Sequence, residues 1–304
     1  MDFKSLKKTN FHVHITGALS PDDLRSISRL CKRDISKFEP LESHMSFFDP
    51  QVWTLPKELT STKKGLLEAI KIILRRERED NVVYLELTIN PAGMFRRGLE
   101  KKDFMEAIIN GIKYGKTLGI RCRIKFGVNR KDGPDSVQIV KEAFDRFPEE
   151  HRACIDLNGD EKQFPTKLFL SVFKKLSSEG TPISIHAGEF PQQIESLEKA
   201  INMCPKRIAH AIASTNNEKI LGAIKKHGII IEVCPISNIK TLASSTKTNS
   251  PIRKFLQYNI PIVLGSDDPA IFGSNLTSEL RQLKQIGLSR KQIIDINKKS
   301  FSLI

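Results

Sequence analysis

Short apolar runs alternate with longer amphipathic segments along most of this chain. Eight short runs predict strands, at Phe11–Thr16, Val82–Ile89, Arg121–Val128, Ala153–Leu157, Pro182–His186, Arg207–Ala211, Ile229–Val233 and Ile260–Ser266. Apolar residues at helical spacing predict helices over Ser20–Lys32, Lys64–Glu79, Lys102–Lys116, Ser136–Phe147, Thr166–Ser178, Gln192–Asn202, Glu218–Lys226, Pro251–Gln257 and Ser289–Lys299. Strands that alternate with helices in this way indicate a parallel sheet built from βα units. We therefore predict an α/β fold.

Several of the predicted strands are apolar on both faces, and Ile229–Val233 is the clearest example. A strand has this composition when a barrel core lies on one side of it and helices on the other. Eight βα units over about 250 residues match a (β/α)8 TIM barrel. No internal repeat, low-complexity tract or Gly/Ser-rich linker interrupts the pattern. We expect residues 1–304 to form a single domain.

Residues 38–61 interrupt the alternation after the first predicted strand and helix. Three prolines punctuate the segment, and its apolar residues show no clear period. Long excursions of this kind often cover functional sites. We therefore expect a lid-like insertion, whose large apolar residues either cover a substrate or pack into the core: Phe47, Phe48, Trp53 and Leu55.

The composition is that of an ordinary globular protein, with 39% hydrophobic and 28% charged residues in 304. No stretch approaches the ~20 apolar residues of a membrane helix, and the N-terminus lacks a signal-peptide core. We expect a cytoplasmic protein without a membrane partner. The five cysteines are scattered and form no Cys-x-x-Cys pair, which argues against a disulfide framework and against a thiolate zinc site.

The formal net charge of +14 could attract nucleic acid, acidic surfaces or phosphorylated ligands. The lysines are dispersed through amphipathic segments, and no long basic run is interleaved with aromatic residues. We therefore do not expect nucleic-acid binding. A phosphorylated small molecule stays open as a ligand, and composition leaves the oligomeric state open.

Two histidines stand one residue apart in the first predicted strand. Side chains two positions apart on a strand point the same way, so His12 and His14 project together while Val13 faces the opposite layer. Two converging imidazoles suggest a metal ligand pair. The alternative is that both are ordinary polar residues on the solvated face of a half-buried strand.

Further polar residues stand at the ends of other predicted strands. They include His186 and Glu189 after the fifth strand, His210 at the sixth, and Asp267 with Asp268 at the eighth. Each has an ordinary structural explanation alone, but the carboxyl ends of barrel strands form one rim, where active sites are built. Three imidazoles with a carboxylate suit zinc better than calcium or magnesium. Zinc would lower the pKa of a bound water towards ~7, which favours hydrolytic chemistry.

Six motifs follow one another along the chain. They are His12-x-His14-x-x-Gly17, Asp156-Leu157-x-Gly159-x-Glu161, His186-Ala187-Gly188-Glu189, Arg207-Ile208-x-His210, Glu232-x-Cys234-Pro235-x-Ser237-Asn238 and Ser266-Asp267-Asp268-Pro269. In order and interval this set resembles the adenosine deaminase family over nearly the whole chain. The resemblance implies a zinc-dependent hydrolytic deaminase of 6-aminopurine nucleosides, with the conversion of adenosine to inosine and ammonia as the default reaction.

The resemblance also implies roles for the metal ligands and the catalytic residues. One zinc ion per chain would be held, together with a water molecule, by His12, His14, His186 and Asp267. Glu189 would protonate N1 of the purine and so make C6 electrophilic. His210 would orient the attacking water and help to deprotonate it. For Glu189 to act as an acid near neutral pH, its pKa must be raised.

A second group of residues would bind the substrate. By the same resemblance, Asp268 would hydrogen-bond N7, and the backbone N–H of Gly159 would reach N3, where the absence of a side chain permits close approach. His14 and Thr16 complete the predicted substrate-binding set.

The sequence departs from the family pattern at positions that bear on the substrate. Thr16 replaces an acid or amide, commonly Asp, that contacts the 5′ end of the ribose in adenosine enzymes. Ala209 and Ala211 flank His210 where the family commonly has glycine, and we expect their methyl groups to narrow the cavity. Alternative substrates are therefore free adenine, an N6-substituted adenine nucleotide or a modified purine nucleoside. A purine-binding barrel without turnover is the remaining alternative.

Overall fold

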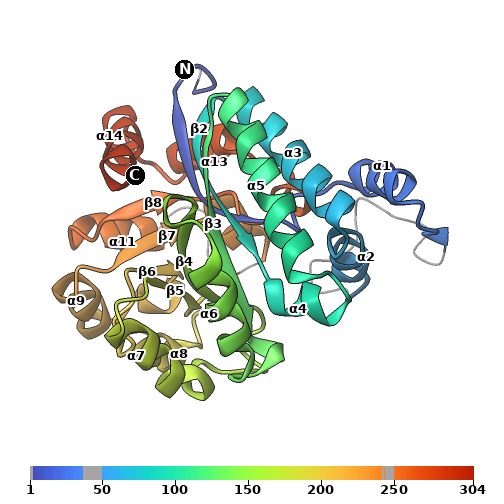
Figure 1. Ribbon diagram of the computed structural model, residues 1–304. Helices are drawn as coiled ribbons and strands as arrows, with labels where there is room; N and C mark the ends of the chain where they lie inside the picture. The colour runs from blue at the N-terminus through green and yellow to red at the C-terminus, as the bar shows by residue number, and fades with distance from the viewer. Residues whose placement is uncertain (1–2, 37–49, 242, 244–249) are drawn as a thin grey trace.

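Eight parallel strands, hydrogen-bonded in chain order, form the centre of the molecule (Figure 1). This computed structural model describes residues 3–36, 50–241, 243 and 250–304. The strands are β1 (Lys8–His14), β2 (Val82–Ile89), β3 (Arg121–Asn129), β4 (Arg152–Asn158), β5 (Ile183–Ala187), β6 (Arg207–His210), β7 (Ile230–Val233) and β8 (Ile262–Leu264). A parallel bridge between Val13 and Asp267 joins the last strand to the first. The predicted α/β barrel is confirmed.

Helices cover the outside of the strands (Figure 1). They are α1 (Pro21–Cys31), α2 (Pro50–Thr60), α3 (Lys63–Glu79), α4 (Pro91–Arg96), α5 (Lys101–Thr117), α6 (Ser136–Arg146), α7 (Leu170–Ser178), α8 (Ile194–Ile201), α9 (Glu218–Lys226), α10 (Pro235–Lys240), α11 (Pro251–Gln257), α12 (Pro269–Phe272), α13 (Leu276–Gln285) and α14 (Arg290–Ser300). Each helix predicted from the sequence is present, and helices such as α10 and α13 add to them. In the described part of the chain no helix combines the length and the apolar character needed to cross a membrane.

The first strand begins earlier than the sequence pattern predicts, because its polar residues find partners inside the protein. The ammonium of Lys8 is fully buried and donates to the carbonyls of Phe3, Lys4 and Leu6 at 3.1, 3.2 and 2.8 Å. The amide of Asn10 donates to Glu77 Oε1 at 3.0 Å. These acceptors offset part of the cost of burying the polar groups, so a polar sequence can still form an interior strand.

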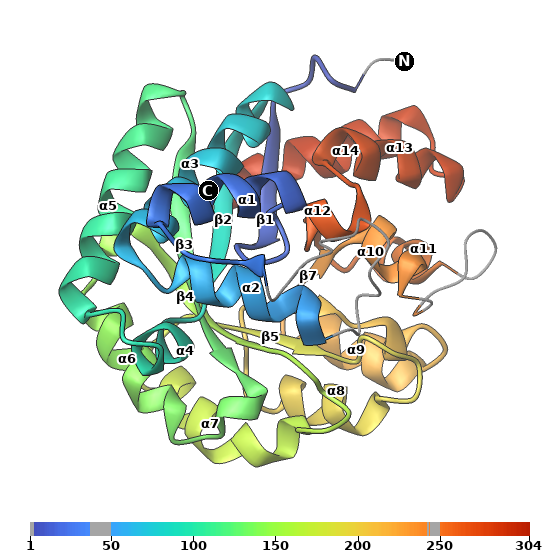
Figure 2. The same ribbon diagram turned by 90° about the vertical axis from the view of Figure 1, so that its right-hand side faces the viewer.

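The expected insertion over residues 38–61 lies partly outside the described residues, which leave out 37–49. Its remainder is helix α2, where the sequence shows no clear helical period. Leu55 and Leu59, four positions apart, are buried against the core, while Trp53 is half-buried. The helix passes in front of the strands in Figure 2. The described part is therefore a helix that packs one apolar edge on the barrel.

The junction between β8 and β1 brings two backbones into close contact. The N–H of His14 donates to Asp267 O at 2.9 Å, and the N–H of Asp267 donates to His12 O at 2.8 Å. A Cβ atom at Gly265 would lie 2.2 Å from His12 Cβ. Glycine at this position therefore allows the barrel to close directly beside His12.

This contact predicts that Gly265→Ala lowers the free energy of unfolding by about 1–3 kcal/mol, because the new methyl group overlaps packed atoms of β1. Urea denaturation measures the change. Gly222→Ala is the matched control: a Cβ atom there meets nothing within 4 Å on the exposed face of α9. Alanine at 222 should leave stability unchanged or raise it by up to about 1 kcal/mol. Equal stability of the two variants would contradict close packing at Gly265.

Candidate active site

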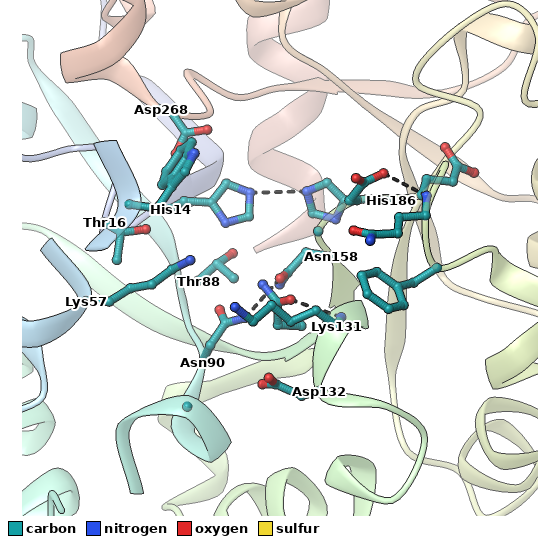
Figure 3. A pocket seen from close by; sticks show the side chains of 18 of the residues that line it. His14, Thr16, Lys57, Thr88, Asn90, Lys131, Asp132, Asn158, His186 and Asp268 are labelled. Atoms are coloured by element: carbon teal, nitrogen blue, oxygen red, sulfur yellow. Dashed lines mark hydrogen bonds between the residues drawn. The ribbon is translucent and has the colours of Figure 1, made fainter. Parts of the chain in front are cut away.

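Three imidazole rings face one another at the carboxyl-terminal rim of the barrel, and Figure 3 shows two of them, His14 and His186. The Nε2 atoms of His12 and His14 are 3.1 Å apart, those of His14 and His186 3.1 Å, and those of His186 and His12 3.0 Å. Burial, together with the neighbouring His12 and His186 rings, lowers the pKa of His14 to about 3. Burial also lowers the pKa of His186. Hydrogen bonds to Asp267 and Glu232 outweigh burial at His12 and raise its pKa to about 10, so a metal ion would have to displace a proton from that ring. Neutral rings present lone pairs, which is the form that binds a metal.

Asp267 adds a carboxylate to this triangle. Its Oδ1 atom lies 3.5 Å from Nε2 of both His12 and His14. Its other oxygen accepts a hydrogen bond from Ser237 Oγ at 2.7 Å. The residue has a positive φ of 62°, a conformation that costs a non-glycine residue free energy and is most common at functional sites.

Buried acceptors fix the outward-facing nitrogens of two of these rings. Nδ1 of His12 lies 2.6 Å from Glu232 Oε2. Nδ1 of His186 lies 3.1 Å from the carbonyl of Leu157 and 3.4 Å from Asp156 Oδ2. An acceptor at Nδ1 holds the proton there and leaves the Nε2 lone pair free, as in metal-binding histidines.

Glu189 is presented by a loop that a second carboxylate holds in place. Oε1 of the buried Glu161 accepts the N–H of Gly188 at 2.8 Å, and Oε2 accepts the N–H of Glu189 at 3.3 Å. Burial raises the pKa of the Glu189 carboxyl. This is the direction that an acid working near neutral pH requires.

His210 is buried beside the histidine triangle, with its ring centroid 5.6 Å from that of His12. The amide nitrogen of Asn238 lies 3.0 Å from Nδ1 of His210. The expectation that Ala209 and Ala211 narrow the cavity is wrong, because both residues are fully buried and neither lines it. Ala211 packs into the apolar core with a positive φ of 52°. Glycine adopts this backbone conformation at a lower free-energy cost than alanine does.

Several buried polar atoms around the site have no hydrogen-bond partner among the described residues. They include Oδ1 of Asp268 and Oγ1 of Thr88, and both side chains line the cavity. Burial and the neighbouring Asp267 raise the pKa of Asp268 well above its usual range. Gly17 makes room for Asp268, since a Cβ atom there would lie 1.8 Å from Asp268 Oδ1. Unpaired buried atoms of this kind are available to a ligand.

A single cavity of about 1120 Å³ opens over these groups. Every site residue predicted from the sequence lines it except His12, which is fully buried: Glu189, His210, Asp268, Gly159, His14, Thr16, His186 and Asp267. Gly159 has a positive φ of 99°, and a Cβ atom there would lie 3.1 Å from Asn129 Oδ1.

The cavity is lined by five basic side chains: Lys57, Arg96, Arg97, Lys131 and Lys162. In Figure 3, Lys57 extends into it from the same side as Thr16.

The sequence model of the family described as adenosine deaminase matches residues 7–303. The chain belongs to the adenosine deaminase family. Proteins of this family related to the chain are hydrolytic deaminases that act on C–N bonds, so the chain is an enzyme of this class.

Two relatives of this deaminase differ in their named substrates. An adenosine deaminase of Clostridium botulinum (strain 657 / Type Ba4) is 29% identical over 304 residues, covering 95% of this chain and 91% of its own. An N6-methyl-AMP deaminase of Bos taurus is 26% identical over 325 residues, covering 99% and 90%.

Two solved structures share the fold of the deaminase. An Arabidopsis protein complexed with IMP has a TM-score of 0.87 at 20% identity and covers 100% of this chain and 94% of that one. A zinc-bound amidohydrolase from Burkholderia ambifaria has a TM-score of 0.83 at 20% identity and covers 97% and 84%.

The sequence pattern indicates no role for four residues that shape the site. Glu232 and Asn238 both belong to one of the six motifs, and a lone glutamate inside the apolar run Ile229–Val233 is itself a signal of a buried polar contact. Lys125 is a similar signal in β3, and it is fully buried. Lys57 lies in the segment 38–61, whose apolar residues show no helical period. The sequence therefore does not indicate that the side chain of Lys57 points into the cavity.

Proposed function

We propose that this chain is a zinc-dependent hydrolytic deaminase of 6-aminopurine nucleoside 5′-monophosphates, with either a free or a substituted 6-amino group. The observation that carries the metal-dependent reaction is the triangle of Nε2 atoms at 3.0–3.1 Å beside the cavity. The observation that favours a nucleotide over adenosine is Lys57, which extends into the cavity from the same side as Thr16.

The donor set fits zinc. Nitrogens bound to one tetrahedral zinc ion lie about 3.3 Å apart, close to the distances between the three Nε2 atoms. His12, His14, His186 and Asp267 would hold the ion, and the buried partners of Nδ1 already orient two of the rings. Zinc bound there would supply the Lewis acidity that makes hydroxide available near neutral pH.

The side chains of the chain itself would carry the remaining steps. Glu189, whose pKa burial raises, donates a proton to ring nitrogen N1 as hydroxide adds to C6. Asn238 donates to Nδ1 of His210, which places the proton of the neutral ring on Nε2. In this form His210 orients the attacking water by donating to it, and it has no lone pair with which to deprotonate that water, contrary to the expectation from the family resemblance. Protonated Asp268 donates to N7, and Gly159 N–H donates to N3. The hydroxyl proton at C6 then passes to the amino nitrogen, the C6–N bond breaks, and loss of ammonia, or of a substituted amine, leaves the 6-oxopurine.

The 5′ end of the substrate would lie beside Thr16, where an acidic residue would repel a phosphate and a threonine can donate to it. Lys57 extends towards this region (Figure 3). Burial, followed by the charges of Lys131 and Arg97, lowers the pKa of Lys57. Lys57 Nζ lies 5.8 Å from the centroid of the Trp53 ring, and no ion pair of Lys57 or Lys131 is found within the described ranges. Both lysines line the cavity, so their ammonium groups are available to an anion. The relative complexed with IMP and the N6-methyl-AMP deaminase agree with a nucleotide.

We predict that the purified protein contains about one zinc ion per chain and releases ammonia from AMP or methylamine from N6-methyl-AMP. Glu189→Gln should keep the zinc and lose at least about 100-fold in kcat, because an amide cannot supply the proton. Metal analysis and a coupled ammonia assay measure both quantities. Undiminished turnover by Glu189→Gln would show that another group is the acid.

Lys57→Met should lower kcat/KM for the nucleotide by about 10-fold or more, since one charge-assisted contact to phosphate is lost. The same variant should leave kcat/KM for adenosine nearly unchanged. Lys64→Met, at an exposed position on α3 outside the cavity, is the matched control and should affect neither substrate. A wild-type preference for adenosine, or an equal loss for both substrates in Lys57→Met, would argue against the phosphate and favour the adenosine reaction instead.

A further inference from the structure

A lysine lies inside the barrel directly beneath the histidine triangle. Lys125 is in the middle of β3, level with Thr88 of β2 and Cys154 of β4, and its side chain is fully buried. Barrel interiors are usually filled by branched apolar side chains. Burying an ammonium costs several kcal/mol unless carboxylates compensate its charge. Lys125 therefore requires carboxylate partners, and each of its two partners also faces one of the predicted metal ligands.

The first partner is Glu232 of β7. Lys125 Nζ donates to Glu232 Oε2 at 2.7 Å and to Oε1 at 2.9 Å. Oε2 is also the atom that lies 2.6 Å from Nδ1 of His12. Arg207 Nε lies 2.8 Å from Oε1 and holds the other side of the carboxylate. Both oxygens of Glu232 are therefore tied, and the carboxylate can approach His12 in only one orientation.

The second partner is Asp156 of β4. Its Oδ1 atom lies 3.9 Å from Lys125 Nζ, and its Oδ2 atom lies 3.4 Å from Nδ1 of His186. Asn158 donates to the same Oδ2 atom at 3.1 Å. The ammonium of Lys125 thus lies between the two carboxylates that face the outward nitrogens of His12 and His186.

We infer that Lys125 is a positioning residue for the zinc site, acting on His12 through Glu232 and, more weakly, on His186 through Asp156. The inference rests on the zinc site of the proposed function. Lys125 touches neither the substrate nor the ligand nitrogens. Its effect is to fix the carboxylates, which in turn fix the direction of the Nε2 lone pairs. Outer partners of metal-bound histidines typically change metal affinity by roughly 10- to 100-fold when they are removed.

Lys125→Met tests this inference, because methionine has nearly the same volume and no charge. Zinc affinity, measured by competition with a chromophoric chelator, should fall by about 10-fold or more. The increase in melting temperature on adding zinc to the metal-free protein should become smaller. Lys8→Met is the matched control: Lys8 is equally buried, at the opposite end of the barrel, and bonds backbone carbonyls. It should lose stability while its zinc affinity stays within about twofold of wild type.

The double variant Lys125→Met, Glu232→Gln tests the route through Glu232. A neutral glutamine still accepts from Nδ1 of His12 and needs no buried cation, so removing Lys125 should cost little zinc affinity in the Glu232→Gln background. If Lys125→Met alone does not fold, the zinc affinity of the double variant can still be compared with that of Glu232→Gln. A tenfold loss in that background would overturn the route through Glu232.

Wild-type zinc affinity in a folded Lys125→Met variant, or tighter binding, would overturn the positioning role and leave the proposed function intact. Absence of zinc binding by the unmodified protein would overturn both. The two failures are therefore distinguishable in one series of titrations.

Discussion

Three ring nitrogens in mutual contact impose the constraint on which the rest of the site depends. A neutral imidazole carries one proton, and the acceptors at Nδ1 of His12 and His186 hold that proton on the outer side of each ring. When all three rings are neutral, the inner nitrogens present lone pairs to one another at 3.0–3.1 Å, an arrangement that repels unless a proton or a metal ion lies among them. The raised pKa of His12, about 10, has the same direction, because it favours a positive charge at this point. These nitrogens and one carboxylate are brought together by three features: the strand register, the closure of the barrel at Gly265, and the strained backbone of Asp267.

The interior of the barrel balances the charges that this arrangement requires. Glu232 lies beneath His12 and is fully buried, and it can remain ionised only because Lys125 and Arg207 contact it. Arg207 in turn donates to Glu86 Oε1 at 3.0 Å, which also accepts from Tyr84 at 2.7 Å. The apolar residues that stabilise the fold pack mainly between the strands and the outer helices, so the space inside the barrel is available for ion pairs.

The sequence predicts most of the fold because the apolar residues of parallel strands and of amphipathic helices recur with different periods. Eight successive βα units commonly close into one kind of structure, the (β/α)8 barrel. It predicts the residues of the rim for the same reason, since strand ends such as His186, His210 and Asp267 must meet there. It does not predict α2, whose packing depends on two leucines in a segment rich in proline. It also does not predict which interior charges pair, because Lys125, Asp156 and Glu232 come from three different strands and only their register makes them neighbours.

The proposed reaction requires a metal ion inside the triangle of nitrogens. Diffraction from crystals of the purified protein, recorded on both sides of the zinc absorption edge, shows whether zinc is bound there. We expect one strong anomalous peak per chain, in contact with Nε2 of His12, His14 and His186 and with Asp267. No peak at that position, or a peak bound by other residues while the three rings are bridged by water, would contradict this expectation.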